Sequence, residues 1–104
     1  MPTLIYQGKV HRNTAKIPLD AFSPDKWVDG LCDVWATIYV RLNGGRKVWL
    51  DHCKGHDELP MFIDHCVVKK NKKYIDALNP EGVDDWQDLI FVQRELNNWY
   101  DNPY

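Results

Sequence analysis

A histidine and an aspartate flank a polar turn in the middle of the chain. His65 precedes a Lys/Asn run at residues 69–73, and Asp76 follows it. The β-branched and aromatic residues on both sides of this run favour two short antiparallel strands. If the chain turns through residues 70–71, His65 and Asp76 stand opposite each other on one face, because side chains alternate with a period of two. A carboxylate there would fix the tautomer of the imidazole and raise its pKa, which suits general-base catalysis; the alternative is an ordinary surface pair.

Cys32 is the nucleophile that such a base would need. Its segment, residues 31–42, has apolar residues at helical spacing, but the same residues also alternate as in a strand that pairs with residues 47–52. If the segment is a helix capped by Asp29, Cys32 lies in the first turn, where unpaired N–H groups and the helix dipole lower the pKa of a thiol. The same amides can hold an oxyanion, and Gly30 leaves room for a substrate carbonyl.

Residues 30–36, GLCDVWA, resemble the Gly-x-Cys-x-x-aromatic-Ala helix of the transglutaminase-like and papain-like cysteine enzymes. Residues 65–68 and 73–76 are similar to the His strand and the Asp strand of these enzymes, and they follow in the same order. The resemblance covers about residues 28–80 and implies that the segment around the cysteine is a helix. It further implies a catalytic set of nucleophile, base and orienting carboxylate formed by Cys32, His65 and Asp76.

This resemblance implies a cysteine-dependent acyl-transfer enzyme or amide hydrolase, or a relic of one, that acts on a peptide or protein amide without a cofactor. His65 would deprotonate Cys32, and the thiolate would attack a carbonyl to give a thioester that water or an amine resolves. Asp76 would hold the imidazolium through the reaction.

A zinc site is an alternative interpretation of the cysteines and histidines. Cys53 and His56 have the spacing of a zinc knuckle, and His65 and Cys66 supply two further ligands of suitable type. Because His65 and Cys66 are adjacent, a strand would point them to opposite faces, which disfavours a shared ion.

The aromatic residues allow a third interpretation, a small protein-binding or inhibitor domain without catalytic activity. The chain contains five Trp and five Tyr, and residues 99–104, WYDNPY, would form its most exposed aromatic surface toward a protein partner. This hypothesis predicts that Cys32→Ala leaves function intact, whereas the enzyme hypothesis predicts its loss.

Length, charge and cysteine usage narrow the class of protein. A chain of 104 residues predicts a single domain over residues 1–104. With 13 Lys+Arg against 15 Asp+Glu, the net charge of −2 gives no basic field for binding nucleic acid or a membrane. The basic run at residues 69–73 is more typical of a solvated hairpin tip than of a phosphate-binding patch. Three cysteines without framework spacing, and no apolar N-terminal segment, indicate a cytoplasmic protein.

The remaining segments complete an α+β fold. Residues 3–10 predict a short strand, Ser23 and Pro24 have the types that begin a helical turn, and helical spacing favours a helix from residues 79–80 onward. We therefore expect a small antiparallel sheet packed against an N-terminal helix that bears Cys32 and against a C-terminal helix. The resemblance implies that these elements form a papain-like or transglutaminase-like core.

Overall fold

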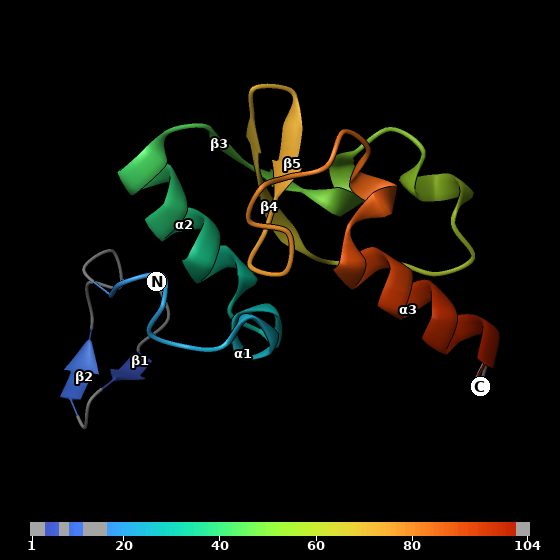
Figure 1. Ribbon diagram of the computed structural model, residues 1–104. Coiled ribbons are helices and arrows are strands. Elements are labelled where there is room, and N and C mark those ends of the chain that lie inside the picture. The colour runs from blue at the N-terminus through green and yellow to red at the C-terminus, as the bar shows by residue number, and fades with distance from the viewer. Residues whose placement is uncertain (1–3, 7–8, 12–16, 102–104) are drawn as a thin grey trace.

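A three-stranded antiparallel sheet lies between two helices near the centre of the molecule (Figure 1). The computed structural model describes residues 4–6, 9–11 and 17–101. The predicted α+β class is confirmed. In chain order the elements are β1 (Leu4–Tyr6), β2 (Lys9–His11), α1 (Pro24–Val28), α2 (Cys32–Asn43), β3 (Arg46–Trp49), β4 (Cys66–Lys70), β5 (Lys73–Ile75) and α3 (Ile90–Asp101), with 3₁₀ turns at Leu50–His52, His56–Glu58 and Trp86–Asp88.

The segment that is ambiguous in the sequence is a helix, so the strand alternative for residues 31–42 is wrong. α2 begins at Cys32 with Leu31 as its N-cap, which offers no side-chain hydrogen bond. The predicted cap Asp29 instead ends the short helix α1, where its N–H donates to the carbonyl of Lys26. α2 ends because Gly44 has φ +85°, a left-handed conformation that glycine adopts without steric cost, and its N–H closes the last turn.

Ser23 and Pro24 begin α1 as predicted. The hydroxyl oxygen of Ser23 accepts a hydrogen bond from the N–H of Lys26 at 3.3 Å, and proline occupies the first turn, where its missing N–H costs nothing. The predicted strand at residues 47–52 is shorter than expected, because the chain leaves β3 at Trp49 and forms a 3₁₀ turn. The predicted strand at residues 3–10 overlaps β1 and the start of β2, and residues 3, 7 and 8 lie outside the described part.

The hairpin of β4 and β5 turns one residue later than predicted. Asn71 and Lys72 form its two-residue turn, both with positive φ (51° and 65°), as a turn of the primed class requires. Lys69 therefore pairs with Tyr74, and the predicted pairing of His65 directly opposite Asp76 is wrong. Moving the turn by one residue shifts the pairing by two, and a shift of two keeps each side chain on its face. His65 and Asp76 thus share a face in a diagonal arrangement.

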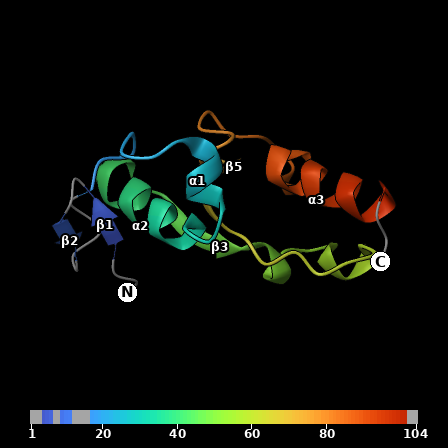
Figure 2. The same ribbon diagram turned by 90° about the horizontal axis from the view of Figure 1, so that it is seen from below.

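The sheet separates two hydrophobic clusters, one on each face. Cys66 and Val68 point toward α1 and α2, where they join the cluster that contains Trp27, Trp35 and Ile38. Val67, between them in the strand, points to the other face and joins a second cluster, whose other buried members are Leu50, Ile63, Trp86, Leu89 and Val92. Figure 2 shows α2 and α3 well separated, with α2 toward the end that carries β1 and β2. Strand alternation thus places the start of β4 at the boundary of both clusters.

The C-terminal helix begins later than predicted. Instead of continuing a helix from residues 79–80, Val83 forms an antiparallel bridge with Tyr74, exchanging backbone hydrogen bonds of 2.8 and 2.9 Å. The chain then makes a 3₁₀ turn at Trp86–Asp88, with Asp85 as its cap, before α3 starts at Ile90. Bridge formation uses backbone groups that a helix would need, so the first part of the predicted helix cannot form. Within the described residues, no helix has the length and apolar character needed to cross a membrane.

Candidate active site

Cys32 occupies the first position of α2 and is half-buried. Its Sγ accepts a hydrogen bond from the N–H of Cys66 at 3.4 Å, so β4 supplies a backbone donor to the thiol at the start of the helix. Burial opposes ionisation of the thiol, but the hydrogen bond with His65, the N–H groups of Cys66 and Asp33 and the positive charge of His65 outweigh it. Together they hold the pKa of Cys32 below its ordinary value.

His65 directly precedes β4, and its side chain is fully buried. Its Nε2 lies 2.8 Å from Oδ2 of Asp76. Nδ1 has no hydrogen-bond partner among the described residues, which leaves this nitrogen free to act on the thiol of Cys32. Burial disfavours the imidazolium, but the hydrogen bonds with Asp76 and Cys32 and their negative charges raise the pKa of His65 above its ordinary value.

Asp76 follows β5 and is only 2% exposed. Its second oxygen, Oδ1, accepts hydrogen bonds from the N–H groups of Leu78 at 3.1 Å and Asn79 at 2.8 Å. This is the turn that an aspartate makes when its carboxylate binds its own backbone two and three residues ahead. One oxygen is therefore anchored by the loop, which leaves the other aimed at His65.

The two pKa shifts act in opposite directions on the two partners. The thiol becomes a stronger acid and the imidazole a stronger base, which together shift the equilibrium from the neutral pair toward the thiolate–imidazolium pair. Asp33 is a neighbouring carboxylate that would oppose a thiolate, but it forms an ion pair with Lys47. The structure thus brings together all three predicted residues, Cys32, His65 and Asp76.

Two residues of this site were absent from the sequence-based prediction. Phe91 of α3 stacks on the His65 imidazole, with ring centroids 3.9 Å apart and planes 14° from parallel. Asn79 accepts a hydrogen bond from the N–H of Ile90 at 2.8 Å, which ties the loop of Asp76 to the first turn of α3. The sequence signal was that Phe91 falls outside the apolar arc that predicted the C-terminal helix, which consists of Val83, Trp86, Leu89, Ile90, Leu96, Trp99 and Tyr100.

The proposed zinc ligands are not assembled. No group of three or more His, Cys, Asp or Glu side chains within the described residues is arranged to hold a metal ion. His56 is buried, and its Nε2 lies 3.0 Å from the backbone nitrogen and 3.1 Å from the carbonyl oxygen of Ile63. It therefore braces the loop between residues 56 and 63. Cys66 points into the cluster under α2, whereas Cys53 lies against the other one.

The aromatic residues divide between the interior and the surface. Trp27 is buried, and its indole N–H donates to the carbonyl of Leu19 at 2.8 Å, so its donor is already used. Tyr100 is 69% exposed, and Trp99 is half-buried. Residues 102–104, the remainder of the predicted aromatic surface, lie outside the described part of the chain.

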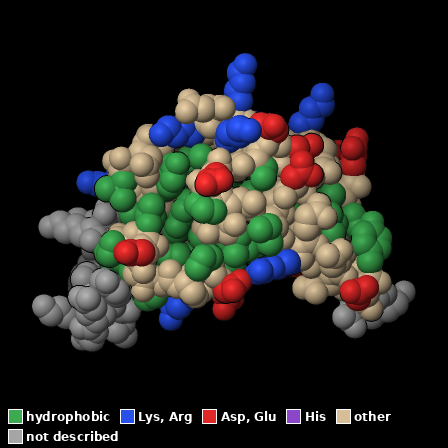
Figure 3. Space-filling view, viewed as in Figure 1, with side chains coloured by type: hydrophobic (Ala, Val, Ile, Leu, Met, Phe, Trp, Pro, Cys, Tyr) green, Lys and Arg blue, Asp and Glu red, His purple; other side chains and the backbone are tan. Residues whose placement is uncertain are grey.

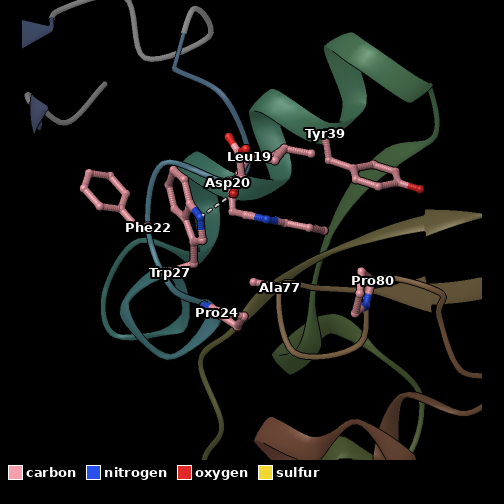
Figure 4. A pocket seen from close by; sticks show the side chains of 9 residues that line it. Leu19, Asp20, Phe22, Pro24, Trp27, Tyr39, Ala77 and Pro80 are labelled. Atoms are coloured by element: carbon pink, nitrogen blue, oxygen red, sulfur yellow. Dashed lines mark hydrogen bonds between the residues drawn. The ribbon is translucent and has the colours of Figure 1, made fainter. Parts of the chain in front are cut away.

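An apolar cleft of about 360 Å³ opens one helical turn along α2 from Cys32. Trp27 and Tyr39 form part of its walls, and Ala77 and Pro80 from the loop after Asp76 lie across from them (Figure 4). In Figure 3, hydrophobic side chains gather over the part of the molecule that contains α1 and α2. The catalytic candidates themselves do not line the cleft, so it adjoins the site without containing it.

No protein-family model, curated protein or solved structure matches this chain.

Proposed function

We propose that this protein is a cysteine-dependent enzyme of the transglutaminase-like or papain-like kind, with α2, β4 and β5 as its catalytic core. It performs acyl transfer or amide hydrolysis on a peptide or protein amide. The observation that supports this most strongly is the buried hydrogen bond between His65 and Asp76, together with a lowered pKa of the Cys32 thiol and a raised pKa of the His65 imidazole that each depend on the other group. A surface ion pair would show neither the burial nor the third partner.

In the proposed mechanism, Nδ1 of His65 takes the proton of the Cys32 thiol. The thiolate attacks the carbonyl carbon, a C–S bond forms, and the carbonyl electrons move to the oxygen, which the free N–H groups of the first turn of α2 stabilise. The C–N bond then breaks, and the imidazolium gives its proton to the leaving amine. The thioester is resolved by water or by a second amine, deprotonated by His65, while Asp76 keeps the ring in the same tautomer.

The redox environment follows from the same chemistry. Cys32, Cys53 and Cys66 are free thiols. A nucleophilic thiolate survives in a reducing compartment, so the proposed activity fits a cytoplasmic protein.

A reactive ester tests the proposed activity without knowledge of the natural substrate. Incubation with p-nitrophenyl acetate should release one p-nitrophenol per protein in a fast first turnover and leave an acetyl group on Cys32 that hydroxylamine removes. Cys32→Ala should abolish both signals, whereas the matched variant Cys53→Ala should retain them. Asp76→Asn preserves the oxygen that binds the loop but removes the charge, so it should slow the first turnover.

Two results would refute the proposal. One is an undiminished burst in Cys32→Ala, and the other is acetylation that is equal at Cys32 and Cys53 in the wild-type protein.

A further inference from the structure

A second cleft, of about 350 Å³, opens on the face of the sheet that points away from α2. Arg46, Lys69 and Tyr74 are cross-strand neighbours in β3, β4 and β5 and therefore line this face together. The complete lining consists of Arg46, Lys47, Val48, Trp49, His52, Cys53, Lys69 and Tyr74. It contains no carboxylate.

The cations in this cleft differ in their ion pairing. Lys47 is paired with Asp33, and His52 lies 3.6 Å from a carboxylate oxygen of Asp51. Arg46 and Lys69, by contrast, have no ion pair within the described part of the chain, and Nζ of Lys69 lies 3.6 Å from the centre of the Tyr74 ring.

Cys53 lines the same cleft as these two cations. Burial raises the pKa of its thiol, the charges of Lys69 and Arg46 act to lower it, and the charge of Asp51 acts to raise it. Arg46 and Lys69, which pair across β3 and β4, thus border the cleft that Cys53 also lines.

We propose that this cleft binds a dianionic oxyanion of the phosphate or phosphate-ester class. Two unpaired cations match two negative charges, and the planar guanidinium of Arg46 presents paired N–H donors that fit phosphate oxygens. The ring of Tyr74 gives an ester an apolar surface beside its charged group.

This inference changes the interpretation of the basic run at residues 69–73. Asn71 and Lys72 form an exposed turn, and Lys73 pairs with Asp84 at 2.6 Å, as expected for a solvated hairpin tip. Lys69 is half-buried and belongs to the cleft instead. The site shares no side chain with the proposed catalytic residues, so it goes beyond the proposed function and does not depend on it.

Alkylation of Cys53 by iodoacetamide provides a direct readout, because the thiol lies inside the cleft. Inorganic phosphate, added at constant ionic strength with chloride as the balancing salt, should slow this alkylation several-fold in a saturable manner. The double variant Arg46→Gln/Lys69→Gln should lose the protection. The control variant Lys72→Gln removes an equal charge at the turn and should keep it.

A parallel titration with phenyl phosphate distinguishes the two sources of the anion. Half-protection at a lower concentration than inorganic phosphate assigns the cleft to an ester, and the reverse assigns it to free phosphate; both support an oxyanion site. The proposal is overturned if phosphate gives no protection beyond that of chloride, or if the double variant is protected as well as the wild type while its thermal unfolding is unchanged.

Discussion

The imidazole of His65 is held by three different kinds of interaction. Asp76 accepts a hydrogen bond from Nε2, the negative charge of a Cys32 thiolate stabilises the charged ring, and the ring of Phe91 stacks on it with centroids 3.9 Å apart. Burial alone would favour the neutral ring, so the charged form depends on these neighbours. An aromatic face stabilises a cation and offers no donor or acceptor that competes for the ring nitrogens. We therefore regard Phe91 as a positioning residue.

Substitution of Phe91 tests this role. Phe91→Leu retains apolar bulk but removes the aromatic face, so the pKa of His65 should fall by roughly half a pH unit, in line with about 0.5–1 kcal/mol for a cation–aromatic contact. Titration of the His65 ring protons by NMR measures this directly. Phe62→Leu is the matched control, because Phe62 contacts another histidine, His56, and is 65% exposed. Equal effects of the two substitutions on His65 would contradict a specific role for Phe91, and Phe91→Tyr should restore the wild-type pKa.

At the scale of secondary structure, the sequence predicts the elements whose signals are local. Ser23 and Pro24 are sufficient to begin α1, and the resemblance of residues 30–36 to a cysteine-bearing helix correctly favoured α2 over a strand. The register of β4 and β5 was wrong because several residues of the Lys/Asn run are possible turn positions. The predicted pair of His65 and Asp76 nevertheless forms, because a register shift of two residues keeps both side chains on the same face of the hairpin.

The contribution of α3 could not be predicted, because it depends on contacts between distant segments. The backbone of Val83 pairs with Tyr74 and delays the helix until Ile90. Only this delayed start, secured by the side chain of Asn79, places Phe91 over the imidazole. Periodicity shows which residues are apolar, but not which backbone N–H and C=O groups are hydrogen-bonded to a neighbouring strand.

The turn after Asp76 depends on Gly82. This residue has φ +86°, and a Cβ there would lie 2.7 Å from Cβ of Lys73 and 3.0 Å from Cγ1 of Ile75. Gly82→Ala should therefore lower the free energy of unfolding by about 2–4 kcal/mol, since backbone strain and overpacking add. Gly44→Ala is the control, because Gly44 has a similar φ of +85° but open space around a Cβ, so it should cost only about 1–2 kcal/mol. Urea denaturation measures both, and equal losses would contradict the packing argument.

For the molecule as a whole, the sheet divides the interior into two clusters, and the candidate site lies where they meet. The helix packed on one face supplies Cys32, the residues that flank β4 and β5 supply His65 and Asp76, and the helix beyond the other face supplies Phe91. Folding therefore shifts the protonation equilibria of the pair, and stability must depend on pH through the same groups.

The pH dependence of stability has a defined sign. Folding lowers the pKa of Cys32 from 9.0, so its contribution is fully present above pH 9.0 and is lost as the pH falls through the folded-state pKa. Folding raises the pKa of His65 from 6.5, so its contribution is fully present below pH 6.5 and is lost as the pH rises through the folded-state pKa. The difference in unfolding free energy between the wild type and Cys32→Ser should therefore shrink on acidification.

Urea denaturation over a series of pH values measures this difference, and Cys53→Ser serves as the control. Folding raises the pKa of Cys53, so the difference between that variant and the wild type should stay constant on acidification. A Cys32→Ser difference that is equally insensitive to acid would argue against a thiolate in the folded protein.

The pH–rate profile of alkylation at each thiol of the native protein tests the central claim most directly. Cys32 should react fastest at neutral pH, with a rate that rises at a pH well below those of Cys53 and Cys66, whose pKa values are raised, in Cys66 to about 12. His65→Gln should return Cys32 to the profile of an ordinary thiol. A Cys32 that reacts no faster than Cys53, with a profile unchanged by His65→Gln, would contradict the proposed pair.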